Sequence, residues 1–331
     1  MNYIGSKHRL TGFIKKSIQD VTGNTREMTF AEIFGGTGAI SRSLKKDVKR
    51  VIANDLEPYS YVLLRNYIGN HRPMEAEQLI AKVNALEPGK GFIYSNYCYG
   101  SGSGRQYFSD ENGMKIDAIR MQVEEWKEYE QITSGEYFFL LASLIESADK
   151  VANTASVYGA FLKKLKKTAQ RPLRIEPANF EYNDHEHEVY NEDANQLISR
   201  ISGDILYLDP PYNSRQYGCN YHILNTIALY DKFAPVGITG VRPYNRSLYC
   251  KRKKVRNTFE DLIREARFRY IFLSYNNEGL MPVSDVIAIM SKYGHYDLLT
   301  TNYKRFKADS DQNRTHKAAR TTEYLHILEK R

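Results

Sequence analysis

An acidic residue, two prolines and an aromatic residue follow one another at Asp209-Pro210-Pro211-Tyr212, directly after the apolar run 205–208. This run predicts a buried strand, and ligand sites in open α/β sheets form where such strands end. Two prolines stiffen the turn and remove backbone donors, so nearby carbonyl oxygens stay free to accept hydrogen bonds. The segment therefore presents a carboxylate, a fixed carbonyl and an aromatic ring together.

Such a turn suits an amino group on an aromatic ring, as in adenine, whose nitrogen lone pair is delocalised. If the Asp209 side chain and the Pro210 carbonyl accept its hydrogens, electron density returns to the nitrogen and makes it a nucleophile. Tyr212 would stack on a base taken out of the duplex, since a stacked base does not expose the target atom. A lone match of this kind is often only a turn.

The elements around the turn indicate a doubly wound sheet. A strand at 28–33, a glycine turn at 34–38 and a helix from 39 to 44 are followed by a second strand at 51–53 and helical spacing over 58–67. Two such β-to-α steps predict parallel strands. Further strands are expected at 205–208, 270–275 and 324–328, so both ends of the chain build the core.

The middle of the chain differs from these segments. A stretch rich in Gly, Ser and Tyr from Tyr94 precedes amphipathic helical segments between 115 and 167. We predict a catalytic domain formed by 1–85 and 178–331, with an inserted, mainly helical region at 86–177.

The composition indicates what kind of protein this is and what it binds. The 331 residues are 42% hydrophobic and 26% charged, as in a packed enzyme-sized fold. The net charge of +8 favours a polyanionic partner. Neither a signal peptide nor an apolar run of membrane-spanning length is evident, and Cys98, Cys219 and Cys250 form no CxxC pair. We expect a cytoplasmic protein without disulfides, zinc knuckles or membrane attachment.

With these motifs in order, the chain resembles the Dam-type adenine-specific DNA methyltransferases over nearly its full length. The matching pieces are the segment 3–7, Phe34-x-Gly36-x-Gly38, Asp55, the segment 192–194 and Asp209-Pro210-Pro211-Tyr212. The resemblance implies a Rossmann-like S-adenosylmethionine-dependent methyltransferase fold. It also implies a catalytic role for Asp209, Pro210, Pro211 and Tyr212.

The resemblance further implies a set of cofactor-binding residues. Gly36 and Gly38 would approach the methionine part of S-adenosylmethionine beside Phe34, Asp55 would accept from the ribose hydroxyls, and Asp193 would meet the adenine ring. Tyr3 and Lys7 would close over the cofactor. Asp55 and Asp193 could instead be helix-capping carboxylates, and the N-terminal segment a frayed tail. A nicotinamide site is disfavoured because the spacing is not GxGxxG.

We expect the residues that bind DNA in the inserted region and in two basic stretches, 242–256 and 303–320. The candidates are Arg105, Gln106, Tyr107, Arg242, Arg246, Lys304, Arg305, Asn313 and Arg314. Lysines at 163, 164, 166 and 167 could follow the phosphate backbone or form a solvated face. His222 is expected to be structural, because the product amine loses its proton readily to solvent.

We predict an enzyme that transfers a methyl group from S-adenosylmethionine to the N6 amino group of a flipped-out adenine in double-stranded DNA, releasing S-adenosylhomocysteine without a metal. It would act in the cytoplasm near the nucleoid of a prokaryote or in phage infection, and a cognate restriction endonuclease that acts separately is the further partner to look for. Cytosine N4 methylation, an RNA or protein-amide target, and a noncatalytic DNA-binding subunit are the alternatives.

Overall fold

The computed structural model describes residues 7–70, 72–304 and 320–331. They form two compact units. The sheet unit contains the described residues of 7–56, 185–216 and 245–331, and the helical unit those of 57–184 and 217–244. The helical unit therefore begins well before residue 86 and takes in a second segment after the proline pair. Its role in target recognition stays a prediction.

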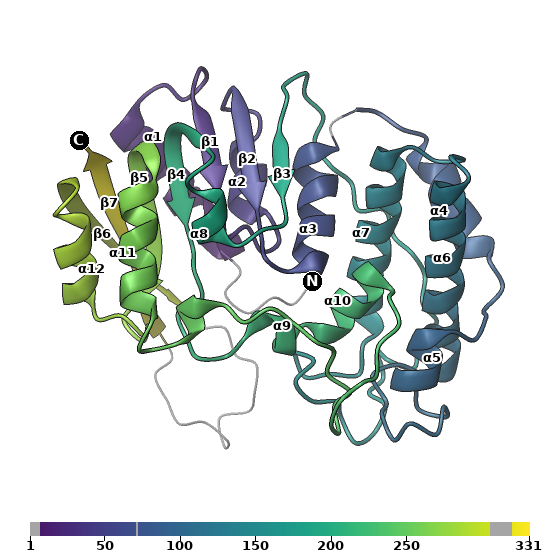
Figure 1. Ribbon diagram of the computed structural model, residues 1–331. Coiled ribbons are helices and arrows are strands. Elements are labelled where there is room, and N and C mark those ends of the chain that lie inside the picture. Colours follow the sequence, from purple (N-terminus) through teal and green to yellow (C-terminus); the bar gives the residue numbers. More distant parts are fainter. Residues whose placement is uncertain (1–6, 71, 305–319) are drawn as a thin grey trace. The chain divides into compact units, whose positions relative to one another are not determined.

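The sheet unit is built on a seven-stranded sheet with the order β3-β2-β1-β4-β5-β7-β6 (Figure 1). The strands from β3 to β5 in that order pair in parallel, whereas β7 pairs antiparallel with β5 and with β6. The strands are β1 (Thr29–Glu32), β2 (Arg50–Asn54), β3 (Glu188–Tyr190), β4 (Ser202–Leu208), β5 (Arg267–Asn276), β6 (Gly294–Lys304) and β7 (Arg320–Lys330). This mostly parallel sheet confirms the predicted Rossmann-like methyltransferase fold.

Helices cover both faces of the sheet, with α8, α11 and α12 on one face and α1 and α2 on the other (Figure 1). Their bounds are α1 (Thr11–Thr22), α2 (Ala39–Leu44), α8 (Ala194–Leu197), α11 (Val255–Glu265) and α12 (Val283–Met290). Side chains alternate between the faces of a strand. One core therefore joins Leu206 and Leu208 of β4 to Leu262 of α11 and Val286 of α12.

The helical unit contains α3 (Pro58–Leu64), a π-helical turn (Arg65–Gly69), α4 (Ala76–Ala85), α5 (Phe92–Tyr97), α6 (Asp110–Glu128), α7 (Ser134–Val151), α9 (Tyr217–Asn220) and α10 (His222–Leu229). Ser109 caps α6, and Thr133 forms a capping box with Glu136 at the start of α7, which satisfies amides that a helix start leaves unpaired. α7 ends at Val151 and the next helix, α8, begins at Ala194, so the lysine-rich segment 163–167 is not helical, unlike the prediction.

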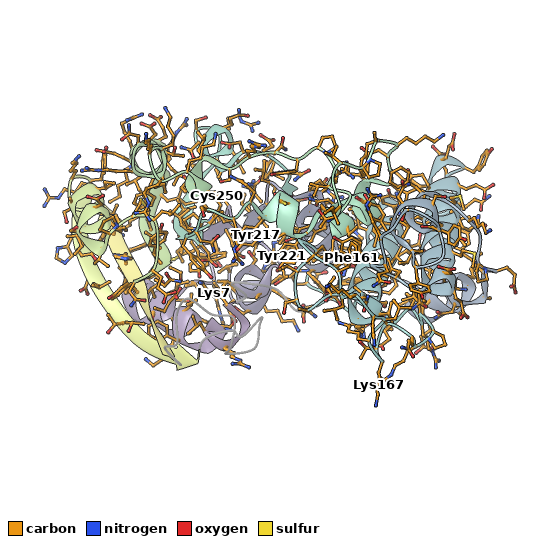
Figure 2. The ribbon with its side chains drawn as sticks, turned by 90° about the horizontal axis from the view of Figure 1, so that it is seen from below. Lys7, Phe161, Lys167, Tyr217, Tyr221 and Cys250 are labelled. Carbon is orange, nitrogen blue, oxygen red and sulfur yellow. The ribbon has the colours of Figure 1, made fainter. Side chains whose placement is uncertain are left out.

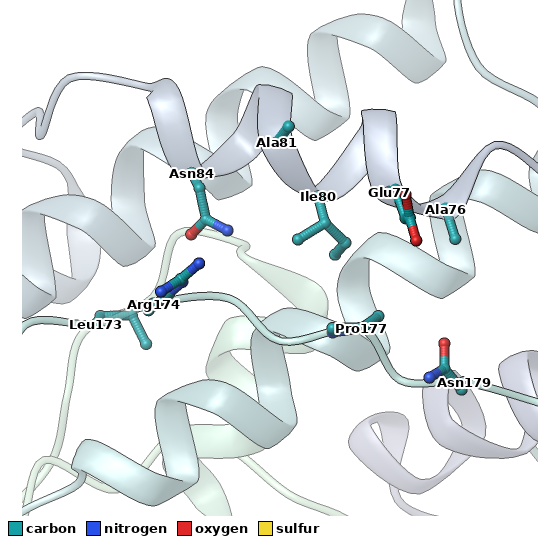
Figure 3. A pocket seen from close by; sticks show the side chains of 9 residues that line it. All are labelled: Ala76, Glu77, Ile80, Ala81, Asn84, Leu173, Arg174, Pro177 and Asn179. Atoms are coloured by element: carbon teal, nitrogen blue, oxygen red, sulfur yellow. The ribbon is translucent and has the colours of Figure 1, made fainter.

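An open hollow of ≈ 720 Å³ lies between α4 and the extended segment 173–179 of the helical unit (Figure 3). Asn84 anchors this segment, since its side chain donates to the Ile175 carbonyl and accepts from the Ile175 amide at 3.0 and 2.9 Å. None of the lining residues belongs to the predicted motifs. Among residues 7–70, 72–304 and 320–331, no helix combines the length and apolar composition needed for crossing a bilayer.

Candidate active site

Asp209-Pro210-Pro211-Tyr212 follows the last residue of β4, at the carboxyl end of a strand that is paired on both sides. Pro210 is buried and the other three residues are half-buried. Within the described part of the chain, no group donates to the Pro210 carbonyl, whereas the Tyr212 carbonyl accepts from the Leu280 amide at 3.0 Å. The turn is therefore held from one end and keeps an acceptor available at the other.

Lys7, which is labelled in Figure 2, contacts this turn through Asp209 and Tyr212. It belongs to the short 3-10 helix Lys7–Arg9, and its Nζ lies 3.1 Å from Oδ1 of Asp209 and 2.8 Å from Oε1 of Glu323. The same ammonium group lies 5.9 Å from the centroid of the Tyr212 ring, within the range of a cation–π interaction. Glu323 comes from β7 and was not predicted as a site residue.

The three charged groups are withdrawn from solvent, because the side chains of Lys7, Asp209 and Glu323 are only 6%, 17% and 2% exposed. Burial alone would lower the pKa of Lys7, but the two carboxylates raise it well above its usual value. Burial raises the pKa of Asp209 to about 6; Lys7 opposes the rise and Glu323 adds to it. Asp209 is therefore ionised at neutral pH, with Oδ1 paired to Lys7.

The glycine bend after β1 has a backbone conformation that glycine adopts more easily than other residues. Gly36 and Gly38 have φ angles of 53° and 75°, the left-handed region that side chains disfavour. The Gly36 amide donates to Oδ2 of Asp55 at 2.7 Å, and the Gly35 amide donates to the Asn54 carbonyl at 2.8 Å. The predicted ribose acceptor thus also holds the bend, so one side chain joins the ends of β1 and β2.

Glu32, the last residue of β1, lies just before the bend and was not predicted as a site residue. Its carboxyl accepts from the amide of Ser41 at 2.9 Å and from the Ser41 hydroxyl, in the first turn of α2. Burial raises the pKa of Glu32 to about 8, against the lowering effect of the bonds from Ser41. The group is therefore mainly neutral at pH 7, which keeps a further negative charge away from Asp209.

Asn54 is a second residue that the sequence did not single out. Its amide nitrogen donates to the carbonyls of Ile33 and Glu192 at 3.0 and 3.1 Å, and its oxygen accepts from the Glu192 amide at 2.9 Å. Asn54 is fully buried. It ties the strand end before Phe34 to the loop that carries Asp193.

Asp193 itself caps α8, since its side chain accepts from the amides of Asn195 and Gln196 at 2.9 and 3.3 Å. The Phe34 ring meets Tyr249 edge-on at 5.0 Å, and the Tyr249 hydroxyl donates to Asn195 at 2.8 Å. Phe34 and the Asp193 loop are thus linked through Tyr249. The capping alternative for Asp193 describes the observed bonds, and its contact with the adenine ring of a cofactor stays a prediction.

The structure thus collects the predicted catalytic and cofactor residues that it describes at one edge of one sheet. They are Lys7, Phe34, Gly36, Gly38, Asp55, Asp193, Asp209, Pro210, Pro211 and Tyr212, all in the sheet unit. Tyr3 lies outside the described residues. The backbone bend, the half-buried carboxylates of Asp55 and Asp193 and the aromatic rim at Phe34 fit a nucleoside attached to a charged amino-acid tail.

The residues predicted to contact DNA, unlike the catalytic and cofactor residues, lie in different environments. Tyr107 is fully buried and donates to the Tyr158 carbonyl at 2.7 Å, so it serves the core of the helical unit rather than a surface. Arg242 is 6% exposed and pairs with Asp231 at 2.9 Å. Arg105 and Gln106 are half-buried and donate to backbone carbonyls of the same unit.

Of the remaining DNA candidates, Arg246 is exposed in the sheet unit, and Lys304 is described only as the last residue of β6. Arg305, Asn313 and Arg314 lie outside the described residues. His222 is fully buried, its Nε2 lies 2.9 Å from the Tyr158 carbonyl, and burial lowers its pKa to about 4. This environment agrees with the structural role expected for His222.

Comparison with known proteins indicates the same family as the order of the motifs. Residues 3–289 match the family described as D12 class N6 adenine-specific DNA methyltransferase. The chain is 60% identical to the Type II methyltransferase M.NlaIII of Neisseria lactamica, covering 100% of this chain and 99% of that protein. It is 38% identical to the Type II methyltransferase M.CviAII of Paramecium bursaria Chlorella virus 1, over 93% of each chain. It is also 37% identical to M.FokI of Planomicrobium okeanokoites, over 53% of that longer protein.

Proposed function

The chain belongs to the D12 class of N6 adenine-specific DNA methyltransferases, and from this premise we propose which of its residues bind, orient and activate the reacting groups. It is an adenine-specific DNA methyltransferase, and DNA is its substrate. The proposal concerns the roles of Lys7, the glycine bend and the turn that follows β4. It rests on the half-buried carboxylate of Asp209, which has one oxygen on Lys7 and, among the described residues, no donor to the other.

S-adenosylmethionine, when bound, would supply an electrophilic methyl group on a sulfonium centre. The bend at 34–38 would hold its amino-acid part, because positive φ angles at Gly36 and Gly38 bring the backbone close to a ligand. The bond from the Gly36 amide holds the Asp55 carboxylate at the bend, and we assign this carboxylate to the ribose hydroxyls. Asp193 and Phe34 would flank the adenine ring of the cofactor.

Asp209 and the Pro210 carbonyl would accept the two hydrogens of the target amino group. Both acceptors are rigid, so they orient the nitrogen lone pair and return electron density to it. Tyr212 would stack on the extruded base. Its backbone is held by the bond from the Leu280 amide, and its ring lies 5.9 Å from the Lys7 ammonium group. The positive charge that develops on the nitrogen lies next to the Asp209 carboxylate, which stabilises it in a site with little water.

Lys7 fixes Asp209 in this arrangement. It holds Oδ1 at 3.1 Å, so the carboxylate presents Oδ2 in one direction. It also keeps the carboxylate ionised against the effect of burial. Without Lys7, the carboxylates of Asp209 and Glu323 would repel each other with no cation between them, which would raise the pKa of Asp209 further.

We infer that the chain is the modification partner of a Type II restriction system, as the names of its relatives suggest, and that a separate endonuclease cleaves the same DNA word when it is unmethylated. Its DNA substrate would then be the chromosome in the bacterial cytoplasm or phage DNA. Plasmid isolated from cells expressing the chain should resist an endonuclease that cleaves at the modified word.

The decisive test of the reaction is to incubate plasmid DNA with the purified chain and S-adenosylmethionine, and to read the modified bases with their sequence context. N6-methyladenine in one recurring word is expected. N4-methylcytosine in its place would contradict the adenine assignment, and the absence of any methyl transfer would favour a noncatalytic DNA-binding subunit.

A further inference from the structure

Four consecutive basic residues, Lys251-Arg252-Lys253-Lys254, lead into α11 of the sheet unit. Their side chains are exposed, and none of them forms an ion pair with a described residue. Arg256, in the first turn of α11, differs from them, because it lies 3.9 Å from Asp285. This first turn contains no acidic residue. Like charges so close together repel one another, and an anion bound beside them would relieve that repulsion.

Hydrogen bonds fix this basic segment to the chain that follows the catalytic turn. The Sγ of Cys250, a residue labelled in Figure 2, donates to the Arg215 carbonyl at 3.3 Å. Gln216 donates from its side chain to the Ser247 carbonyl at 3.2 Å and accepts from the Ser247 amide at 2.8 Å. The four cations therefore begin directly after a residue that is bonded to the chain at position 215.

Arg215 adds a fifth exposed cation. It forms no ion pair with a described residue, and its amide donates to Oδ1 of Asn213 at 2.9 Å, which closes a turn of the Asx type. Arg215 follows Tyr212 by three residues, so their Cα atoms are at most about 11 Å apart. We call Arg215 and residues 251–254 the basic rim. It begins close to the ring on which the target base is proposed to stack.

The basic rim lies at the catalytic edge of the sheet. Arg267, the first residue of β5, pairs with Ser202 at the start of β4, and α11 ends two residues before Arg267. Because α11 runs back along these strands, it begins at the edge where they end and where Asp209 follows β4 (Figure 1). The Tyr249 ring, in the short helix before the basic segment, meets Phe34 at 5.0 Å. The basic rim therefore borders the catalytic turn and the glycine bend within the sheet unit.

We propose that the basic rim binds the phosphates on either side of the target adenine, on the strand that carries it. The inference rests on the proposed function, because these phosphates come to the rim only when the base enters the site at 209–212. An extruded base stays joined to its sugar, so the flanking phosphates move with it. Lys and Arg side chains on phosphates fix the register of a strand without reading its sequence. The rim would thus position the target nucleotide, and other residues would select the DNA word.

The test pairs removal of charge from the protein with removal of charge from the DNA. The protein variants are Arg215→Gln and the double variant Lys253→Gln with Lys254→Gln. The DNA is a short duplex that the parent methylates, in which one phosphate at a time becomes an uncharged methylphosphonate, either beside the target adenine or at the far end of the same strand. Affinity is measured at several salt concentrations with S-adenosylhomocysteine, which has no methyl group to transfer.

Lys46→Gln is the matched control. Lys46 is an exposed cation of the same unit, and it forms no ion pair with a described residue. It lies between the end of α2 and the start of β2, at the opposite edge of the sheet. Its substitution removes the same charge from the protein but none from the catalytic edge.

On the unmodified duplex, the double variant should bind about tenfold more weakly than the parent, and its slope of log affinity against log salt should be smaller by roughly 2. Arg215→Gln should reduce the slope by roughly 1. A methylphosphonate beside the target should weaken binding by the parent about threefold or more. The same change should alter binding by at least one rim variant less than about twofold, since the partner of that phosphate is already gone. Lys46→Gln should match the parent throughout.

If the parent and both rim variants lose the same factor at the flanking positions, the rim does not contact these phosphates and the proposal is overturned. Lost sensitivity at the far end instead would place the rim on a distant part of the duplex and would also overturn it, as would unchanged salt slopes in both variants. Methylation of the unmodified duplex by the parent is measured separately. Failure of that reaction would contradict the proposed function, whereas a failed rim leaves it intact.

Discussion

The ammonium group of Lys7 lies 2.8 Å from the carboxylate of Glu323, on the strand that enters the sheet antiparallel from the C-terminal end. Lys7 is thereby shared between Glu323 and Asp209. One cation between two buried carboxylates leaves a net negative charge beside the catalytic turn. In the proposed mechanism this charge would stabilise the positive nitrogen that forms during methyl transfer.

The first prediction concerns pH. Asp209 can stabilise the developing positive charge only as an ionised carboxylate, so the single-turnover rate should fall as pH drops through about 6, the pKa of this group. Glu323 raises that pKa, and Glu323→Gln removes its charge while keeping its shape. The acid limb of the rate profile should therefore move to lower pH in this variant. Glu32 has a pKa of about 8, so its titration affects a different part of the profile.

Glu329→Gln is the control for this shift, since Glu329 lies on the same strand but pairs with Arg269 at the surface. Its acid limb should coincide with that of the parent. If Glu323→Gln leaves the limb in place or moves it to higher pH, Glu323 does not act through the Lys7–Asp209 pair.

The second prediction concerns the glycine bend. Gly36→Ala forces a side chain into a left-handed backbone and should lower the free energy of unfolding by about 1–2 kcal/mol. It should also weaken the binding of S-adenosylhomocysteine by about tenfold or more, since the bend would move away from the ligand. Calorimetric titration measures the second effect. Gly12→Ala in α1 is the control, because a Cβ there meets no atom within 4 Å.

The third prediction separates a structural arginine from DNA-binding lysines. Arg242 pairs with Asp231 and stacks on Phe233 at 4.9 Å. Arg242→Met should destabilise the chain by about 1–3 kcal/mol in urea unfolding, because it leaves polar groups unpaired. Its DNA affinity should keep the parent's dependence on salt. A reduced salt dependence would show that Arg242 contacts phosphates.

Lys163→Gln and Lys164→Gln should behave in the opposite way. Each is an exposed cation, so its loss should leave stability within about 0.5 kcal/mol. If it contacts a phosphate, it should reduce the slope of log affinity against log salt by roughly 1. Unchanged slopes in both variants would identify these lysines as a solvated face.

The sheet and the catalytic corner could be predicted because their signals are local. The helix at 39–44 has the bounds of α2, and the turn at 209–212 begins directly after β4. Backbone rules connect glycine at 36 and 38 with a bend whatever the rest of the chain does. The short β3 and the irregular β6 were missed, because three residues carry no periodicity and the apolar residues of β6 do not alternate.

Glu323 and Asn54 could not be predicted, because their partners are distant in sequence. Glu323 meets Lys7 only after β7 pairs with β5. One signal was present: Glu323 shares the alternation of Leu325 and Ile327, so an acidic residue occupies a buried phase of a strand.

Tyr107 and Arg242 show what residue type alone does not reveal, and their contact with DNA stays a prediction. Both have residue types suited to DNA, yet burial and pairing use them for packing. Composition cannot distinguish a free cation from one held by a carboxylate elsewhere in the chain. The same limit applies to Arg105, whose contacts with the turn at 236–241 depend on the fold of the helical unit.

The most direct test of the central role of Asp209 is the single-turnover rate of adenine methylation by Asp209→Asn, measured on a duplex that the parent methylates and at saturating S-adenosylmethionine. Loss of a charge-stabilising acceptor should slow the transfer about 100-fold or more, while affinity for S-adenosylhomocysteine stays within about twofold of the parent, because no cofactor contact is assigned to Asp209. A rate within twofold of the parent would contradict the account.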